Sequence, residues 1–247
     1  MKLQWDQTGE KIYELGIDHG VLYRHKKEAG EAGAVIIKPY AQGYVWNGLT
    51  SVDEGVEGGE ANPQYADNIK YLNLIGNEDF NPTINAFTYP DAFAECDGSK
   101  EIMPGIFIAS QDRQEFGFSY RTKVGNDVDG ENYAYKVHLC YGLRAEPSDR
   151  TYETINDSPE AMELSWDCTS TPVPVTGAKP TAHLYFQSNL VPAAFLSALE
   201  DIIYGTEEAD PRLPLPDEIV ELYKSTVNTE ESPVSPPAAE TGLGGDG

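Results

Sequence analysis

The sequence contains few histidines, cysteines and basic residues. Its 247 residues include 4 His and 3 Cys, and 17 Lys and Arg stand against 41 Asp and Glu, so the formal net charge is −24. This charge repels nucleic-acid phosphates and argues against an ordinary DNA- or RNA-binding role. The cysteines are Cys96, Cys140 and Cys168. Because they are odd in number and widely spaced, with no CxxC pair, they indicate reduced thiols in a cytoplasmic product.

Long hydrophobic runs are also missing. No stretch approaches the roughly 20 apolar residues of a membrane span. The N-terminus has no apolar run after Lys2 that would form a signal peptide. We therefore expect a soluble protein that has no membrane partner and is made in the cytosol.

The sequence does contain a strong β pattern. In residues 115–124 and again in residues 133–141, apolar or aromatic side chains occupy alternate positions. A period of two is that of a strand with one buried face. Residues 125–132 between them are rich in turn formers, so the two segments predict a long antiparallel hairpin. The acidic segment between them only superficially resembles a calcium-binding loop and is better explained as the hairpin tip. The tip residues are Asn126, Asp127, Asp129 and Glu131.

Further strands and two helices are predicted around this hairpin. The remaining strands cover residues 11–17 and 21–25 (joined by a turn at 18–20), 34–49 (with a break or an edge at Pro39), 69–75, 83–89, 162–168 and 181–187. One helical turn is predicted at 90–96, an amphipathic helix at 192–205 and a short helix at 216–224. This order predicts a mainly β, α+β fold of two packed antiparallel sheets, as a sandwich or barrel, flanked by one α-helix.

Two segments stand out from the predicted domain of residues 1–224. Residues 53–67 are a loop by composition, and a loop of this length in a compact domain is either functional or disordered. Its candidate contact residues are Asp53, Glu54, Glu57, Glu60, Asn62, Tyr65 and Asp67. Residues 225–247 are rich in Pro, Gly, Ser and Glu, which predicts a disordered tail.

No pattern in the sequence predicts catalysis, a metal or a cofactor. His138 and Cys140 lie on one face of a strand, but two ligands do not make a site and no third follows at ligand spacing. There is no GxSxG motif and no recognisable Cys–His pattern, and the glycine-rich stretches lack a phosphate-binding motif. The many acids give accidental carboxylate pairs, which carry no weight. Long hairpins without a catalytic cluster favour a structural building block over an enzyme.

Six separated segments together resemble the major tail proteins of long, non-contractile-tailed bacteriophages and related prophages. They are WNGLTSV (46–52), YADNIKYL (65–72), FTYPDAFAECDG (87–98), YRT through GND (120–127), YETINDSPE (152–160) and LPLPD (213–217). They keep their order along residues 4–223, and none is catalytic. The extension after Tyr223 departs from this pattern.

The resemblance implies a tail-tube-protein-like fold, six copies of which close into a ring whose inner strands form one barrel. Rings then stack into the tail tube that conducts the genome, and the loop at 53–67 reaches a neighbouring ring. The implied partners are further copies of the chain and the tail terminator, tape-measure and distal tail proteins. The implied location is the virion tail, assembled in the bacterial host cytoplasm, with DNA passing through an acidic lumen without specific binding.

Two other function classes stay open. Tyrosine-rich faces are common in binding surfaces, so a carbohydrate-binding or adhesin-type β-sandwich module of a phage particle is the main alternative. An acidic hydrolase is the third.

Overall fold

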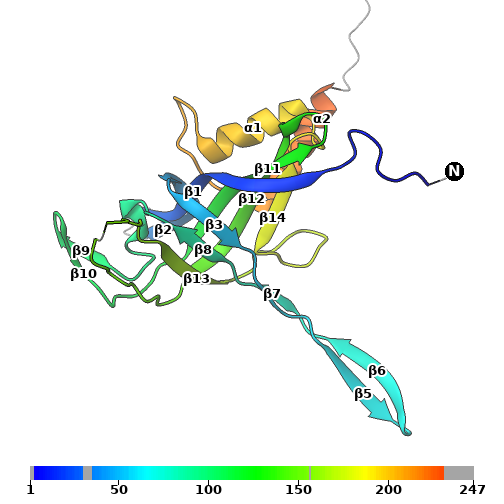
Figure 1. The fold of residues 1–247 in the computed structure, drawn as a ribbon, viewed down its shortest axis with the longest axis horizontal. Helices are drawn as coiled ribbons and strands as arrows, with labels where there is room; N and C mark the ends of the chain where they lie inside the picture. Colours follow the sequence, from blue (N-terminus) through cyan, green and yellow to red (C-terminus); the bar gives the residue numbers. More distant parts are fainter. Residues whose placement is uncertain (1–2, 30–34, 156, 231–247) are drawn as a thin grey trace, which may run out of the picture.

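Strands dominate the computed structural model, which describes residues 3–29, 35–155 and 157–230 (Figure 1). The main sheet is built from β1 (Tyr13–Ala29), β2 (Val35–Trp46), β11 (Phe116–Asn126), β12 (Gly130–Ala145) and β14 (His183–Gln187). Three shorter strands continue it: β3 (Leu49–Asp53), β8 (Thr83–Ala86) and β13 (Leu164–Ser170). The pairings of these strands are antiparallel. The prediction of a mainly β, antiparallel α+β fold is therefore confirmed, as is the long hairpin formed by β11 and β12.

The strand order turns the sheet over on itself. It runs β2-β1-β11-β12-β13-β8-β3, with β14 also beside β12. The far edge of β12 pairs first with β14, from Lys136 to Cys140, and then with β13, from Leu143 to Ala145. Gly142 lies between these two stretches with φ +62°, a backbone conformation that glycine adopts without strain. This corner lets β13, β8 and β3 pack back over the face of β1 and β11.

Two cores lie on opposite faces of the main sheet. The core between the sheet layers joins β1, β2 and β11 to β8, β13 and the 3₁₀ turn Asp91–Phe93, and its largest buried side chains include Leu22, Trp46, Ile84, Phe93, Phe116, Phe118 and Trp166. The other face packs on α1 (Ala193–Tyr204) and α2 (Pro216–Glu230) through Tyr23, Leu139, Tyr141, Phe195, Leu199, Ile203 and Ile219. Two helices, rather than one, cover this face.

A long hairpin projects from the body on the side away from the helices (Figure 1). It contains β4 (Val56–Gly58), β5 (Ala61–Ala66), β6 (Ile69–Ile75) and β7 (Glu78–Phe80), and the pairs β4–β7 and β5–β6 follow one another along it. We call residues 56–80 the arm. Its turn is Asp67-Asn68, and both residues have positive φ, as the tight two-residue hairpin turn requires.

The arm corrects the prediction that residues 53–67 are a loop. Glycine, proline and acids in this segment suggested irregular structure, but residues 69–80 supply a hydrogen-bonding partner along most of its length. The strand predicted at 69–75 is confirmed as β6. Its partner β5 was missed because a strand with no buried face shows no alternation of apolar residues.

Three other features differ from the prediction: a bulge, an additional hairpin and the end of a helix. Residues 18–20 form no turn: β1 continues through them with register shifts on either side of Asp18, where Gly16 and His19 have positive φ, so they are a bulge. An unpredicted hairpin forms from β9 (Lys100–Met103) and β10 (Ile106–Ile108). Helix α2 extends to Glu230, so the predicted start of the tail at Ser225 is wrong. Residues 231–247 of that predicted tail lie outside the described residues.

Candidate functional site

The outer part of the arm exposes apolar side chains on both of its faces. Alternation along the regular part of β6 places Ile75 on one face and Leu72 and Leu74 on the other. Ile69 and Tyr71 lie before and at a register shift between Lys70 and Leu72. All five are exposed, as is Tyr65 on β5. An isolated two-stranded hairpin is marginally stable in water. An arm of this composition therefore has the character of a contact surface.

The residues predicted as contacts lie along the arm or just before it. Glu57 accepts a hydrogen bond from Asn81 Nδ2 at 3.2 Å, and Asn62 Oδ1 accepts one from Gln64 Nε2 at 3.2 Å. Asp67 forms the turn at the tip, and Glu60 lies between β4 and β5. Asp53 ends β3, and its carboxylate accepts a hydrogen bond from Asn85 Nδ2 at 3.2 Å.

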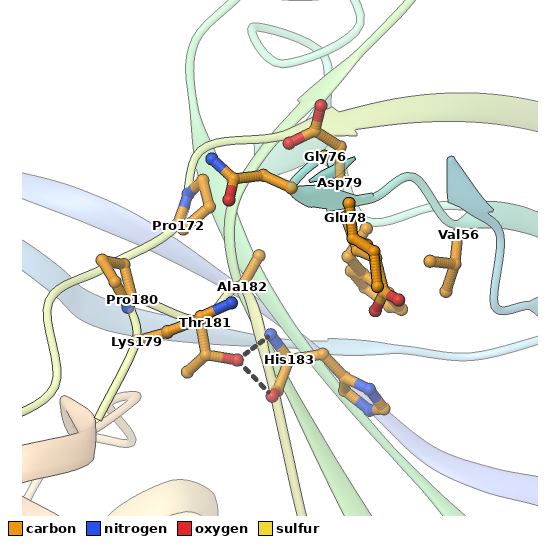
Figure 2. A pocket seen from close by; sticks show the side chains of 13 residues that line it. Val56, Gly76, Glu78, Asp79, Pro172, Lys179, Pro180, Thr181, Ala182 and His183 are labelled. Carbon is orange, nitrogen blue, oxygen red and sulfur yellow. Dashed lines mark hydrogen bonds between the residues drawn. The ribbon is translucent and has the colours of Figure 1, made fainter. Parts of the chain in front are cut away.

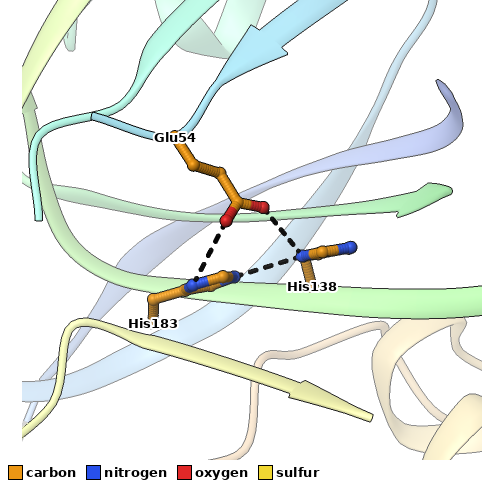
Figure 3. Close-up of side chains that lie close together, drawn as sticks. All are labelled: Glu54, His138 and His183. Atoms are coloured by element: carbon orange, nitrogen blue, oxygen red, sulfur yellow. Dashed lines mark hydrogen bonds and ion pairs between the residues drawn. The ribbon is translucent and has the colours of Figure 1, made fainter. Parts of the chain in front are cut away.

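The seventh residue of that set, Glu54, lies at the root of the arm in a cluster with two histidines (Figure 3). Its Oε1 stands 3.0 Å from Nδ1 of His138, on β12. The same nitrogen is 3.2 Å from Nε2 of His183, on β14. Glu54 Oε2 and His183 Nδ1 are 3.9 Å apart, which is too far for a hydrogen bond. The three side chains thus meet from three separate segments.

Neighbouring side chains hold the cluster in place. Thr122 Oγ1 lies 3.1 Å from the other nitrogen of His138, and the Tyr120 hydroxyl donates to Glu54. The Tyr120 ring stacks on His138 with centroids 4.5 Å apart and planes 5° apart. Phe80, the last residue of the arm, stacks on His183 at 4.6 Å and 11°. One leg of the arm therefore begins just after Glu54, a member of the cluster, and the other ends at Phe80, which stacks on it.

Burial and charge set the protonation of the cluster. The hydrogen bond from His138, helped by the one from Tyr120, lowers the pKa of Glu54 to about 2 against the opposing effect of burial. Burial lowers the pKa of His183, although the charge of Glu54 opposes this shift. Burial raises the pKa of Tyr120, so this phenol stays a donor. At neutral pH Glu54 is thus a carboxylate and His183 a neutral imidazole.

Open cavities reach the cluster from two sides. One, of about 640 Å³, is lined by Glu54, Tyr120, Thr122 and His138 together with Glu14 and residues of β3. The other, of about 630 Å³, lies between β7 and residues 179–183 and reaches His183 (Figure 2). There the Thr181 hydroxyl donates to the His183 carbonyl at 2.7 Å and fixes the start of β14. Solvent species can therefore approach the imidazoles.

The predicted tip of the β11–β12 hairpin contacts the segment that precedes β1. Asn126 is buried and its Oδ1 accepts the backbone N–H of Val128 at 3.0 Å, which closes the turn. Asp127 Oδ1 accepts the backbone N–H of Gly9 at 3.0 Å and that of Lys11 at 3.3 Å. The tip thus anchors the segment before β1. Asp129 accepts from Asn126 Nδ2, and Glu131 pairs with Lys123 at 3.0 Å.

The sequence set His138 beside Cys140 and offered no third ligand for that pair. Cys140 lies on the same strand but is buried in the core between the sheet layers, where burial raises its pKa well above the usual value. The actual neighbours of His138 are His183 and Glu54. The register of β12 against β14, which sets Cys140 opposite His183, brings the two histidines together. No sequence spacing reveals that register.

Comparison with known proteins adds no assignment. No protein-family model matches this chain, and no curated protein shows a significant match to it. Neither helix in the described part of the chain combines the length and the apolar character needed to cross a membrane.

Proposed function

We propose that this chain is a structural subunit that assembles with copies of itself into hexameric rings, which stack to form a phage tail tube. The resemblance of the six sequence segments to major tail proteins motivates the proposal. The observation that carries it is the arm, which projects from the body (Figure 1). The arm also carries exposed apolar side chains. Contiguous exposed apolar surface of this kind marks a surface that a partner covers.

A second copy of the chain is the partner that fits best. The strand order ends at β2 on one side and at β3 on the other. Ile36, Ile37 and Val45 on β2 are exposed. Residues 211–213 cover part of the β2 edge, because the Gly43 N–H donates to the Pro211 carbonyl at 2.8 Å and the Leu213 N–H donates to the Tyr40 carbonyl at 3.1 Å. Edges that no segment covers are an aggregation hazard in a monomer, but they become productive where symmetry closes them into a larger sheet. Lateral pairing would then build the ring, and the arm would join one ring to the next.

The remaining parts of the proposal follow from the tube. An acidic chain of net charge −24 suits a conduit through which DNA slides without being held. The partners at the ends and inside the tube would be tail terminator, distal tail and tape-measure proteins, and the location would be the virion. The chain would act without catalysis.

Excision of the outer arm tests the proposal. Ala61 and Ile75 are register partners, so deleting 61–75 removes β5 and β6 while keeping the β4–β7 pairs. We expect full-length protein to form tubes in negative-stain micrographs and the deletion variant to fold but to stop at rings or single subunits. Tubes of normal length from the deletion variant would contradict the role of the arm.

A matched pair of double variants separates the arm surface from general loss of apolar area. Tyr71→Ser with Ile75→Ser alters arm residues that are 68% and 71% exposed, and we expect it to weaken polymerisation. Tyr152→Ser with Ile155→Ser makes the same change at residues that are 76% and 83% exposed outside the arm, and it should polymerise like the parent. A full-length protein that stays monomeric and binds glycans would instead favour the carbohydrate-binding alternative.

A further inference from the structure

The cluster at the arm root has the composition of a transition-metal site. We propose that Glu54, His138 and His183 bind one divalent zinc ion, which ties the arm root to β12 and β14. Each residue offers one ligand atom, and these atoms all lie within 4.8 Å of one another. Two imidazoles and one carboxylate form a known zinc ligand set, in which water takes the fourth position. Zinc binding here does not depend on the tube proposal.

The spacing of the ligand atoms fits such an ion. Zinc–nitrogen bonds of 2.0–2.1 Å in a tetrahedral site place neighbouring ligand atoms about 3.3 Å apart. His138 Nδ1 lies 3.2 Å from His183 Nε2 and 3.0 Å from Glu54 Oε1. All of the ligand atoms lie within 4.8 Å of one another, so side-chain rotations that shorten the third separation can direct all three atoms to a common point.

The surrounding residues provide the outer support that metal ligands usually have. Nε2 of His138 is held by Thr122, which leaves Nδ1 as the ligand. A threonine hydroxyl both donates and accepts, so it can hold His138 in the tautomer with Nε2 protonated. Tyr120 donates to Glu54, and stacking on Tyr120 and Phe80 restrains the two rings. These contacts arrange the ligands before an ion arrives.

Hydrogen bonding alone leaves the cluster incompletely paired. His138 Nδ1 faces both Glu54 and His183 and can direct only one proton toward the two of them. The other carboxylate oxygen, Glu54 Oε2, lies 3.9 Å from His183 Nδ1, which is too far for a hydrogen bond. A zinc ion would engage the lone pairs of both imidazoles and the carboxylate at once. The cavity lined by Glu54 and His138 gives it a path from solvent.

The test is zinc titration of full-length protein that has been stripped with EDTA. We expect calorimetry to show one zinc ion per chain with micromolar or tighter affinity, and Co²⁺ to give the visible absorption of a low-coordinate nitrogen–oxygen site. Thermal unfolding should shift upward with zinc, because an ion that binds the folded state stabilises it. Binding that is absent, or weak and without a defined stoichiometry as on scattered surface carboxylates, would overturn the proposal.

Two variants and one control assign the site. His183→Ala and Glu54→Gln should each weaken zinc binding at least about 10-fold and abolish the thermal shift. His25→Ala is the matched control, because His25 also faces a glutamate, with Nε2 3.4 Å from Glu115 Oε1, but has no second histidine in that contact. It should bind zinc like the parent. Unchanged binding in both site variants, or equal loss in His25→Ala, would refute the assignment. Glu54→Gln keeps the test decisive if His183→Ala does not fold.

Discussion

The corner at Gly142 gives a sharp test of how the sheet is folded over. An alanine Cβ at this position would lie 2.1 Å from the carbonyl oxygen of Thr171 and 3.0 Å from its nitrogen. Both are backbone atoms, so no side-chain rotation relieves the contact. Gly142 also accepts a hydrogen bond from the Thr171 N–H at 2.9 Å and donates one to the Tyr40 hydroxyl at 2.9 Å. Gly142→Ala should therefore displace β13 from β12.

Gly16 provides a matched control for the energetic cost of placing alanine in a left-handed backbone conformation. Its φ is +64°, close to the +62° of Gly142, and it also lies within a strand, but an added Cβ there would meet no atom within 4 Å. Gly16→Ala should cost only the left-handed conformation, about 1–2 kcal/mol. Gly142→Ala adds about 1–3 kcal/mol for overpacking and about 1 kcal/mol for each weakened hydrogen bond. With two such hydrogen bonds, the expected total is about 4–7 kcal/mol.

Thermal and urea unfolding of the two variants measure this difference. For a chain of this size, 1 kcal/mol corresponds to about 2–4 °C in Tm. Gly16→Ala should therefore lower Tm by a few degrees, and Gly142→Ala by about 10–20 °C. Equal losses in the two variants would show that the Thr171 contact costs nothing and would refute the account of the corner.

Three further outcomes are expected. Arg121 donates to Asp18 from Nε at 2.7 Å and from Nη2 at 3.0 Å, and these hydrogen bonds lower the pKa of Asp18. Asp18→Asn should therefore reduce the free energy of unfolding in urea at pH 7, and this loss should shrink as the pH falls below about 4. Truncation after Glu230 should keep the Tm of the full chain and its assembly in micrographs, whereas truncation after Lys224 should lower Tm because it cuts α2. Duplex DNA should show no measurable binding in a low-salt gel-shift assay, and retention there would reveal a basic surface that contradicts the conduit.

The sequence predicted those elements that bury one face against a core. In β13 the alternation of Leu164, Trp166 and Cys168 is reproduced as alternating buried and exposed positions, and the stripe Phe195, Leu199 and Ile203 is the buried face of α1. These patterns are local, because each side chain meets the same core at a fixed period. Strand and helix periodicity therefore sufficed for most of the body.

The arm and its root escaped prediction for a different reason. β5 pairs only with β6 and buries nothing, so its sequence Ala61–Ala66 carries no periodicity, and only the turn at Asp67-Asn68 signals a hairpin. Glu54, His138 and His183 meet through the register of strands far apart in the chain. Such pairings follow from the three-dimensional fold and not from local spacing.

The positions of these two features give the arm root its importance. The arm's outer part has no core of its own, so its direction is set where its legs leave the body, beside Glu54 and Phe80. A shift of angle at the root is multiplied along the length of the hairpin, so contacts at the root control where the apolar tip can reach. Glu54, which the sequence assigned to a contact loop, lies in the cluster with His138 and His183 at this root. In the tube proposal, the direction of the arm therefore depends on contacts with His138 and His183 rather than on its own composition.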